Sequence, residues 1–288
     1  MNKAFVFRIY PNKEQKILLA KTFGCARFIW NKMLSDKKDC YEKTGKSLKT
    51  TPARYKEEYP FLCEVDSLAL ANEQLSLEKA YKNFWNGKGK VGFPGYKSKH
   101  KDRSSYTTNY VNGNIKIADG KIKLPKLKWV TIKQHRDIPE DYKLKSCTLS
   151  QDPDGKYYVS VLFAYKETIT QQKVEKVIGL DFSMKELYVD DEGGIPEYPR
   201  FYRKAQEKLS REQRKLSKCE KGSNNRAKQR KRVAKLHKKV SNQRKDFLHK
   251  QSRQITNAYD AVVVENLNMK DMSKALRFGK AVHDNGWG

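Results

Sequence analysis

The 288-residue sequence has few acidic residues, no long apolar segment and no paired cysteines. Its 33 Asp and Glu residues are outnumbered by 61 Lys and Arg residues, which gives a formal net charge of +28 at pH 7. Such a charge repels itself unless a polyanion neutralises it, so the composition favours nucleic acid as the partner. The hydrophobic fraction is only 38%, but 12 Phe, 16 Tyr and 4 Trp provide large apolar surfaces for a folded protein.

No segment reaches the roughly 18–20 consecutive apolar residues that a membrane-spanning helix needs, and the N-terminus has no signal-peptide core. The five cysteines are widely spaced and form no Cys-x-x-Cys pair. This spacing argues against a disulfide framework and against a zinc site within these residues. We therefore expect a cytoplasmic, nucleoid-associated protein without a membrane partner. The sequence carries no sign of its oligomeric state.

The first 90 residues combine one strand with two helices. Alternating apolar residues predict a strand over 5–11, and Asn12 follows as the N-cap of a helix over 13–41. Helical spacing predicts a second helix over 67–85. We expect its apolar side to consist of Leu68, Ala71, Leu75, Leu77, Ala80, Tyr81 and Phe84, continued by Trp85.

Between residues 91 and 173 the pattern becomes β-like. Short alternating segments are separated by three turn dipeptides that are strong hairpin signals: Asn112-Gly113, Asp119-Gly120 and Asp154-Gly155. These signals predict a small β-barrel or open sheet, with the helices inserted after its first strand.

A third pattern begins at residue 174. Two nearly continuous apolar segments, 177–182 and 261–265, predict strands that are buried on both faces, with a hairpin partner over 187–189. Between them, residues 200–253 contain 21 basic and 4 acidic residues together with an apolar stripe. This pattern predicts two basic helices that are joined near Gly222.

Asp181 and Glu265 each end an apolar strand segment, and the helical crossover separates them. Ligand and metal sites collect at the strand ends of α/β sheets. Two carboxylates that converge on a divalent cation can orient a water and neutralise a phosphate, as metal-assisted phosphodiester cleavage requires. The alternative is that each carboxylate caps a strand or pairs with a lysine. Because two such acids occur in a strongly basic chain, we favour a metal site.

The basic helices and one aromatic segment provide the candidate nucleic-acid contacts. The helices contain too few acids for a self-supporting solvated face, so we expect them to bind a phosphate backbone. In the segment 84–97, rings alternate with lysines, a pattern that can stack on bases, although we expect most of these rings in a core. The candidates are Tyr96, Lys97, Arg226, Arg230, Lys231, Arg232, Lys235, Lys238, Lys239 and Arg244.

Several segments resemble, in order along the chain, the TnpB proteins, which are transposon-associated RNA-guided nucleases regarded as ancestors of type V CRISPR effectors. Residues 178–185 are similar to the first RuvC segment of that family, and residues 264–267 are similar to the second. The other similar segments are 7–12, 24–31, 93–97, 221–226 and 242–250.

This resemblance implies an α+β part followed by an α/β part. The first is a wedge-type β-barrel with a helical recognition insertion, and the second is an RNase H-like RuvC domain with long basic helices. The implied boundaries are 1–12 for the first barrel strand, 13–90 for the helical insertion, 91–173 for the remainder of the barrel, and 174–288 for a RuvC-like domain that is C-terminally incomplete.

The resemblance also implies a guide RNA and double-stranded target DNA as partners, with a short target-adjacent motif in the DNA. Asp181 and Glu265 would be the first two members of an Asp-Glu-Asp triad that binds Mg²⁺. The family's zinc ribbon and third aspartate would follow the last segment, and these 288 residues contain neither. The spare acids outside the motif position are Asp190, Asp191, Asp271 and Asp284.

Two functions follow as hypotheses. The first is an RNA-guided DNA-binding protein, such as a repressor, in which cleavage is lost because the triad is incomplete. The alternative is an active RNA-guided, Mg²⁺-dependent DNA endonuclease whose C-terminal part lies beyond these residues. Asp181 and Glu265 favour the endonuclease, whereas the missing third acid favours the binding protein. For the 288-residue chain we expect the binding protein.

Overall fold

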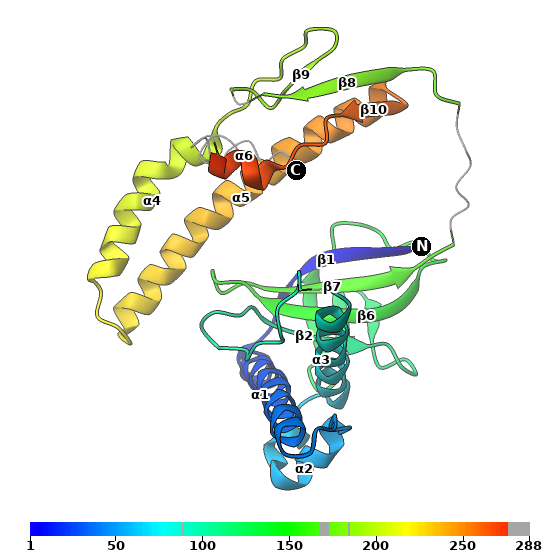
Figure 1. The fold of residues 1–288 in the computed structure, drawn as a ribbon, viewed down its shortest axis with the longest axis vertical. Helices are drawn as coiled ribbons and strands as arrows, with labels where there is room; N and C mark the ends of the chain where they lie inside the picture. Colours follow the sequence, from blue (N-terminus) through cyan, green and yellow to red (C-terminus); the bar gives the residue numbers. More distant parts are fainter. Residues whose placement is uncertain (88, 167–172, 184, 276–288) are drawn as a thin grey trace. The chain divides into compact units, whose positions relative to one another are not determined.

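The computed structural model describes residues 1–87, 89–166, 173–183 and 185–275. The chain divides into two compact units, Met1–Thr168 and Ile169–Gly288. Each unit is described by itself below (Figure 1). The predicted linker Thr168–Lys173 lies outside the described residues except for Lys173.

The first unit is built on a curled antiparallel sheet with the strand order β2-β6-β7-β1-β5-β4-β3. β1 lies in its centre and pairs with β5 and β7. Phe5, Phe7 and Ile9 alternate along β1 and are buried in the core, which confirms the predicted first strand. The strands are β1 (Asn2–Tyr10), β2 (Ser104–Asn109), β3 (Lys116–Ala118), β4 (Lys121–Leu124), β5 (Lys128–Lys133), β6 (Lys143–Gln151) and β7 (Tyr157–Ala164).

Two of the three predicted hairpins are confirmed. Asp119-Gly120, with φ angles of 48° and 66°, joins the paired strands β3 and β4, and Asp154-Gly155 joins β6 and β7. The hairpin at Asn112-Gly113 is wrong, because this turn leads from β2 to β3 and β2 pairs with β6 instead. The turn is held locally by Asn114, whose Oδ1 accepts a hydrogen bond from the backbone N–H of Val111 at 2.8 Å.

The helical insertion consists of α1 (Lys13–Thr44) and α3 (Ser67–Asn86), which pack against each other (Figure 1). Asn12 caps α1 as predicted, and it forms a reciprocal capping box with Gln15. The short elements η1 (Pro52–Arg54), α2 (Tyr55–Glu58) and η2 (Pro60–Cys63) connect the two long helices.

The predicted apolar side of α3 is partly wrong. The helix buries Ala69, Leu70, Glu73 and Leu77, whereas Leu75 is 55% exposed and Trp85 is 68% exposed. Apolar residues occur around more than one side of this helix, so their spacing alone did not identify the side that packs against α1.

The second unit contains a three-stranded sheet with the order β10-β8-β9. Its strands are β8 (Val177–Phe182), β9 (Tyr188–Asp190) and β10 (Ala261–Val264), and its helices are α4 (Phe201–Lys218), α5 (Asn224–Ala258) and α6 (Met269–Ala275). β9 is antiparallel to β8, as predicted, and β10 is parallel to it. The two basic helices are confirmed as α4 and α5, and Gly222 between them has a φ of 90°.

The prediction that both strands are buried on both faces is wrong. Ile178 and Leu180 of β8 are buried in a cluster that includes Phe247 and Leu248 of α5. In β10, however, Val262, Val263 and Val264 are 39–61% exposed. Among the described residues, helix packing covers one face of the sheet and β10 forms its edge. None of the helices in the described part of the chain is both long enough and apolar enough to cross a membrane.

Candidate nuclease site and nucleic-acid interface

Asp181 and Glu265 lie at corresponding positions of two neighbouring strands. In the parallel pair β8–β10, Leu180 is opposite Val264, and each carboxylate residue comes directly after its member of this pair. Parallel strands end at the same edge of a sheet, so both acids belong to one edge. Both residues are exposed, and neither side chain has a hydrogen bond or an ion pair with another described residue. Among the described residues, neither carboxylate therefore has the lysine partner that one form of the alternative interpretation proposes.

This pair of acids suits Mg²⁺ chemically. Mg²⁺ prefers oxygen ligands, keeps several waters, and is commonly held by one or two carboxylates together with substrate phosphates. Within the described ranges, no group of three or more His, Cys, Asp or Glu residues could hold a metal ion. Asp181 and Glu265 could together offer two carboxylates to such an ion.

The nearby spare acids are engaged in local structure. Asp191 connects a turn to β8, because its Oδ2 accepts a hydrogen bond from the backbone N–H of Gly179 at 3.1 Å. Asp190 accepts one from the backbone N–H of Gly194 in the same turn. Asp271 accepts one from the side chain of Asn268 at the start of α6. Asp284 lies outside the described residues.

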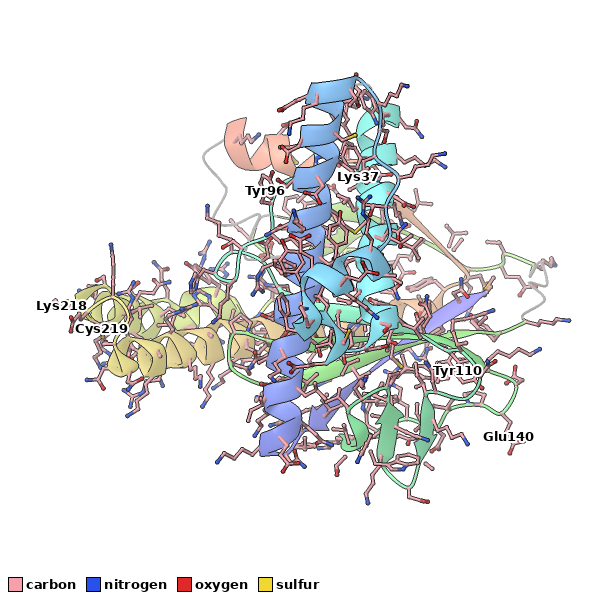
Figure 2. All side chains as sticks on the ribbon, turned by 90° about the horizontal axis from the view of Figure 1, so that it is seen from below. Lys37, Tyr96, Tyr110, Glu140, Lys218 and Cys219 are labelled. Atoms are coloured by element: carbon pink, nitrogen blue, oxygen red, sulfur yellow. The ribbon has the colours of Figure 1, made fainter. Side chains whose placement is uncertain are left out.

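Helix α5 exposes a dense set of positive charges. Its buried positions include Val233 and Val240, whereas its other sides carry exposed lysines and arginines. Asp246 is the only acid in α5, and it pairs with Lys250 at 2.8 Å. In Figure 2, many nitrogen-tipped side chains extend from the hairpin of α4 and α5 near the labelled Lys218 and Cys219. The predicted contacts that are exposed in this helix are Arg230, Lys231, Arg232, Lys235 and Lys239.

The other predicted contacts in α5 are less accessible. Arg226 closes the end of α4, because its Nη1 donates hydrogen bonds at 2.9 Å to the backbone carbonyls of Leu216 and Cys219. The carbonyl of Leu216 also accepts a hydrogen bond from the backbone N–H of Cys219, so Arg226 adds hydrogen bonds at a helix end where the usual i+4 partners are missing. Lys238 and Arg244 are half-buried. The structure thus separates an exposed set of cations from residues that hold the hairpin together.

Tyr96 and Lys97 also divide into one exposed residue and one residue that is anchored in the structure. Tyr96 is 55% exposed, and the ammonium nitrogen of Lys38 lies 5.0 Å from its ring centroid. Lys97 is anchored by an ion pair with Glu73. Trp85, which the sequence placed in a core, is instead exposed beside a cavity of about 500 Å³ between α1 and α3. The feature of the sequence that could have identified Trp85 as a binding residue is the alternation of rings and lysines around it.

Comparison with known proteins connects these features to a family. Residues 160–276 match the family model OrfB_IS605, described as "Probable transposase", and residues 1–46 match its "Helix-turn-helix domain" model. A Streptomyces pristinaespiralis protein named as an RNA-guided DNA endonuclease is 31% identical over 298 residues, which cover 100% of this chain and 72% of the relative. The RNA-guided DNA endonuclease InsQ of Escherichia coli strain K12 is 28% identical over 281 residues, which cover 95% of this chain and 68% of InsQ.

Among solved structures, a Cas12f1 protein in a complex with sgRNA and target DNA matches with a TM-score of 0.51 and 11% identity. The match covers 99% of this chain and 86% of that one, and it supports the expected mixed α+β fold. The sequence identity to the first relative extends over this whole chain and most of the relative. The chain therefore belongs to the TnpB family of transposon-associated RNA-guided nucleases.

Proposed function

We propose that this protein binds a guide RNA and, through it, matching double-stranded DNA beside a short target-adjacent motif. The observation that carries the proposal is the surface of α5, where exposed lysines and arginines are accompanied by a single acid. Relatives named as RNA-guided DNA endonucleases and the Cas12f1 complex with sgRNA and target DNA support the same assignment.

In this proposal the protein and the RNA divide the task of recognition. Pairing between guide and target reads the sequence, and the protein binds the backbone of the heteroduplex through a positive surface. Phosphate contacts carry no sequence information of their own but fix position and orientation. The exposed cations of α5 suit this role, because they are numerous and the helix contains a single acid, Asp246, which pairs with Lys250.

We further propose that Asp181 and Glu265 hold Mg²⁺ and that the 288-residue chain binds DNA without cutting it efficiently. A bound Mg²⁺ would stabilise the charge that develops on a phosphate during cleavage. The described residues offer two carboxylates for it, and the three nearby described acids have other hydrogen-bonding partners. Binding without cleavage suits a repressor. The alternative is a nuclease in which residues other than those described provide the third acid.

The test begins with the RNA that accompanies the protein. We expect purified protein to carry a discrete RNA, which sequencing identifies. Reconstituted with that RNA, the protein should bind labelled DNA that matches the guide, and a guide with a scrambled targeting portion should abolish this binding. Equal binding of matched and unmatched DNA would contradict RNA guidance and leave only a nonspecific basic protein.

A further inference from the structure

A cavity of about 500 Å³ lies between α1 and α3 in the first unit. Four rings line it, from Tyr41, Tyr81, Trp85 and Phe93. Three of them are strongly exposed: Trp85 by 68%, Tyr41 by 60% and Phe93 by 45%. Aromatic rings left in water at a concave site mark a surface that a ligand covers. The cavity volume lies within the roughly 300–1,000 Å³ that is typical of small-molecule sites.

Contacts between rings hold the walls of this cavity. The ring of Phe93 meets Tyr81 edge-to-face at a centroid distance of 5.4 Å, and it meets Phe84 at 5.3 Å. Phe84 in turn contacts Trp85 at 5.0 Å. Edge-to-face packing of this kind fixes ring orientation. The walls are therefore in place before a ligand enters.

Charged groups of both signs surround the rings. The ammonium nitrogen of Lys38 lies 5.0 Å from the Phe93 ring centroid. Lys37 donates a hydrogen bond to the carbonyl of Leu48 at 2.8 Å, which anchors it to the wall; Figure 2 labels Lys37 on α1. Glu42 and Glu78 also line the cavity. The cavity thus combines flat apolar walls with hydrogen-bond acceptors and a cation.

We propose that this cavity binds one unpaired nucleobase of a nucleic acid, and that it prefers bases with an exocyclic amino group. The base would stack on the ring of Trp85, its amino group would donate to Glu42 or Glu78, and Lys38 would contact the adjacent phosphate. Stacking on aromatic side chains accepts any base, whereas a carboxylate acceptor favours an amino group. This inference rests on the proposed function and adds a base-recognition site to it.

A protein segment is the competing occupant. An apolar peptide would cover the rings, but it would also bury Lys38, Glu42 and Glu78 without satisfying both signs of charge, which is unfavourable. A nucleotide presents an aromatic face, amino donors and a phosphate at the same time. The chemistry of the lining therefore favours the nucleotide.

The test uses the full chain and single-stranded oligonucleotides that are eight nucleotides long. We expect Trp85→Ala to weaken binding of oligo(A) by about 5- to 150-fold, the equivalent of one lost base stack. Binding of an abasic oligonucleotide with the same phosphates should not change. Trp129→Ala is the matched control, because Trp129 is 44% exposed in the same unit and does not line this cavity. Running RNA and DNA oligonucleotides in parallel shows whether guide or displaced DNA is the source of the base.

Two further measurements identify the chemistry. Wild-type protein should prefer oligo(A) to oligo(U), and Glu42→Gln with Glu78→Gln should remove most of that preference. Adenosine 5′-monophosphate should quench the fluorescence of Trp85, so the quench should disappear in Trp85→Phe. Melting temperatures equal to wild type show that the variants are folded.

Equal loss of intact and abasic oligonucleotides in Trp85→Ala would overturn the inference, and so would an unchanged affinity for oligo(A). Either result would favour a protein segment, rather than a nucleobase, as the occupant of the cavity. Failure of the proposed function looks different, because wild-type protein would then bind guide-matched and unmatched DNA equally, whatever Trp85→Ala does to the binding of oligo(A). In that case the quenching by adenosine 5′-monophosphate still decides whether the cavity takes a base.

Discussion

The ammonium nitrogen of Lys97 lies 2.5 Å from Oε2 of Glu73 and 4.0 Å from the centroid of the Trp30 ring. Glu73 is only 7% exposed. The same segment is fixed through its backbone, because Nε1 of Trp30 donates to the carbonyl of Gly95 at 3.0 Å and Nδ2 of Asn31 donates to that of Lys97 at 2.9 Å. These contacts fasten the Phe93–Lys97 segment to both α1 and α3.

We therefore expect Lys97→Met to lower the free energy of unfolding by about 1–3 kcal/mol. The substitution leaves the buried carboxylate of Glu73 without its charged partner, and the partial exposure of Lys97 keeps the cost below that of a fully buried pair. Urea unfolding measures the effect. Lys99→Met is the control, since Lys99 is exposed and has no ion pair with a described residue. Equal stability of the two variants would mean that the ion pair contributes nothing.

Charge reversal at four exposed positions of α5 should reduce RNA affinity by orders of magnitude. Each neutralised phosphate contributes roughly −0.7 to −0.9 to the slope of log affinity against log salt, so the slope should also become less steep. The variant carries Glu in place of Arg230, Lys231, Arg232 and Lys235. Its charge-matched control carries Glu in place of Lys116, Lys121, Lys123 and Lys133, which are exposed in the first unit. Equal losses in both variants would mean that α5 acts only through net charge.

Asp181→Asn and Glu265→Gln should each weaken the binding of Mn²⁺, used as a probe for Mg²⁺, by about tenfold or more. Electron paramagnetic resonance measures free Mn²⁺ directly. Guide RNA affinity should stay within about twofold of wild type, because both acids belong to one sheet edge rather than to the basic surface of α5. Asp260→Asn is a control, since Asp260 accepts backbone hydrogen bonds from Glu175 and Lys176. If Asp181→Asn and Glu265→Gln both bind Mn²⁺ as tightly as wild type does, the proposal that these two acids hold the metal ion is contradicted.

With its guide and Mg²⁺, the 288-residue chain should bind matching DNA and leave it uncut. A reacting group displaced by about 1 Å can already lower a rate on the order of a hundredfold, and two carboxylates fix the attacking water less completely than three. Gel analysis of end-labelled DNA gives the measurement. Guide-dependent cleavage that disappears in Asp181→Ala would contradict this expectation and show that another acid completes the site.

The first unit should lose stability above pH 10. Burial raises the pKa of Tyr55 from 10.0 to about 12, and Tyr55 is only 4% exposed. The unfolded chain therefore releases this proton at lower pH than the folded chain does, so the contribution is intact below pH 10 and declines between pH 10 and 12 by about 1.4 kcal/mol per unit. Tyr55→Phe should make the decline shallower in urea unfolding at pH 9, 10 and 11. An identical slope in both proteins would contradict the assignment.

Local signals predicted much of the fold, because a capping residue, a turn dipeptide or an alternating strand can be recognised from a few neighbouring residues. Asn12 and Asp119-Gly120 are examples. Burial was harder to predict, since it depends on what lies against a surface: Trp85 and Val263 are apolar and exposed. Glu73, the partner of Lys97, is 24 residues away, and no local pattern connects the two. The sequence placed Asp181 and Glu265 at strand ends, but only the register of β8 and β10 makes them neighbours.

The length of α5 determines how long a nucleic-acid duplex must be to lie along the whole helix. With 35 residues and a rise of 1.5 Å per residue, the helix is a rod of about 52 Å. One turn of B-form DNA, the form of the target before the guide pairs with it, advances only about 34–36 Å. A duplex aligned with this rod would present the same strand to it more than once, so phosphates separated by a full turn would meet cations of one helix. Duplexes shorter than about 15 base pairs, at 3.4 Å each, would leave part of the rod unoccupied.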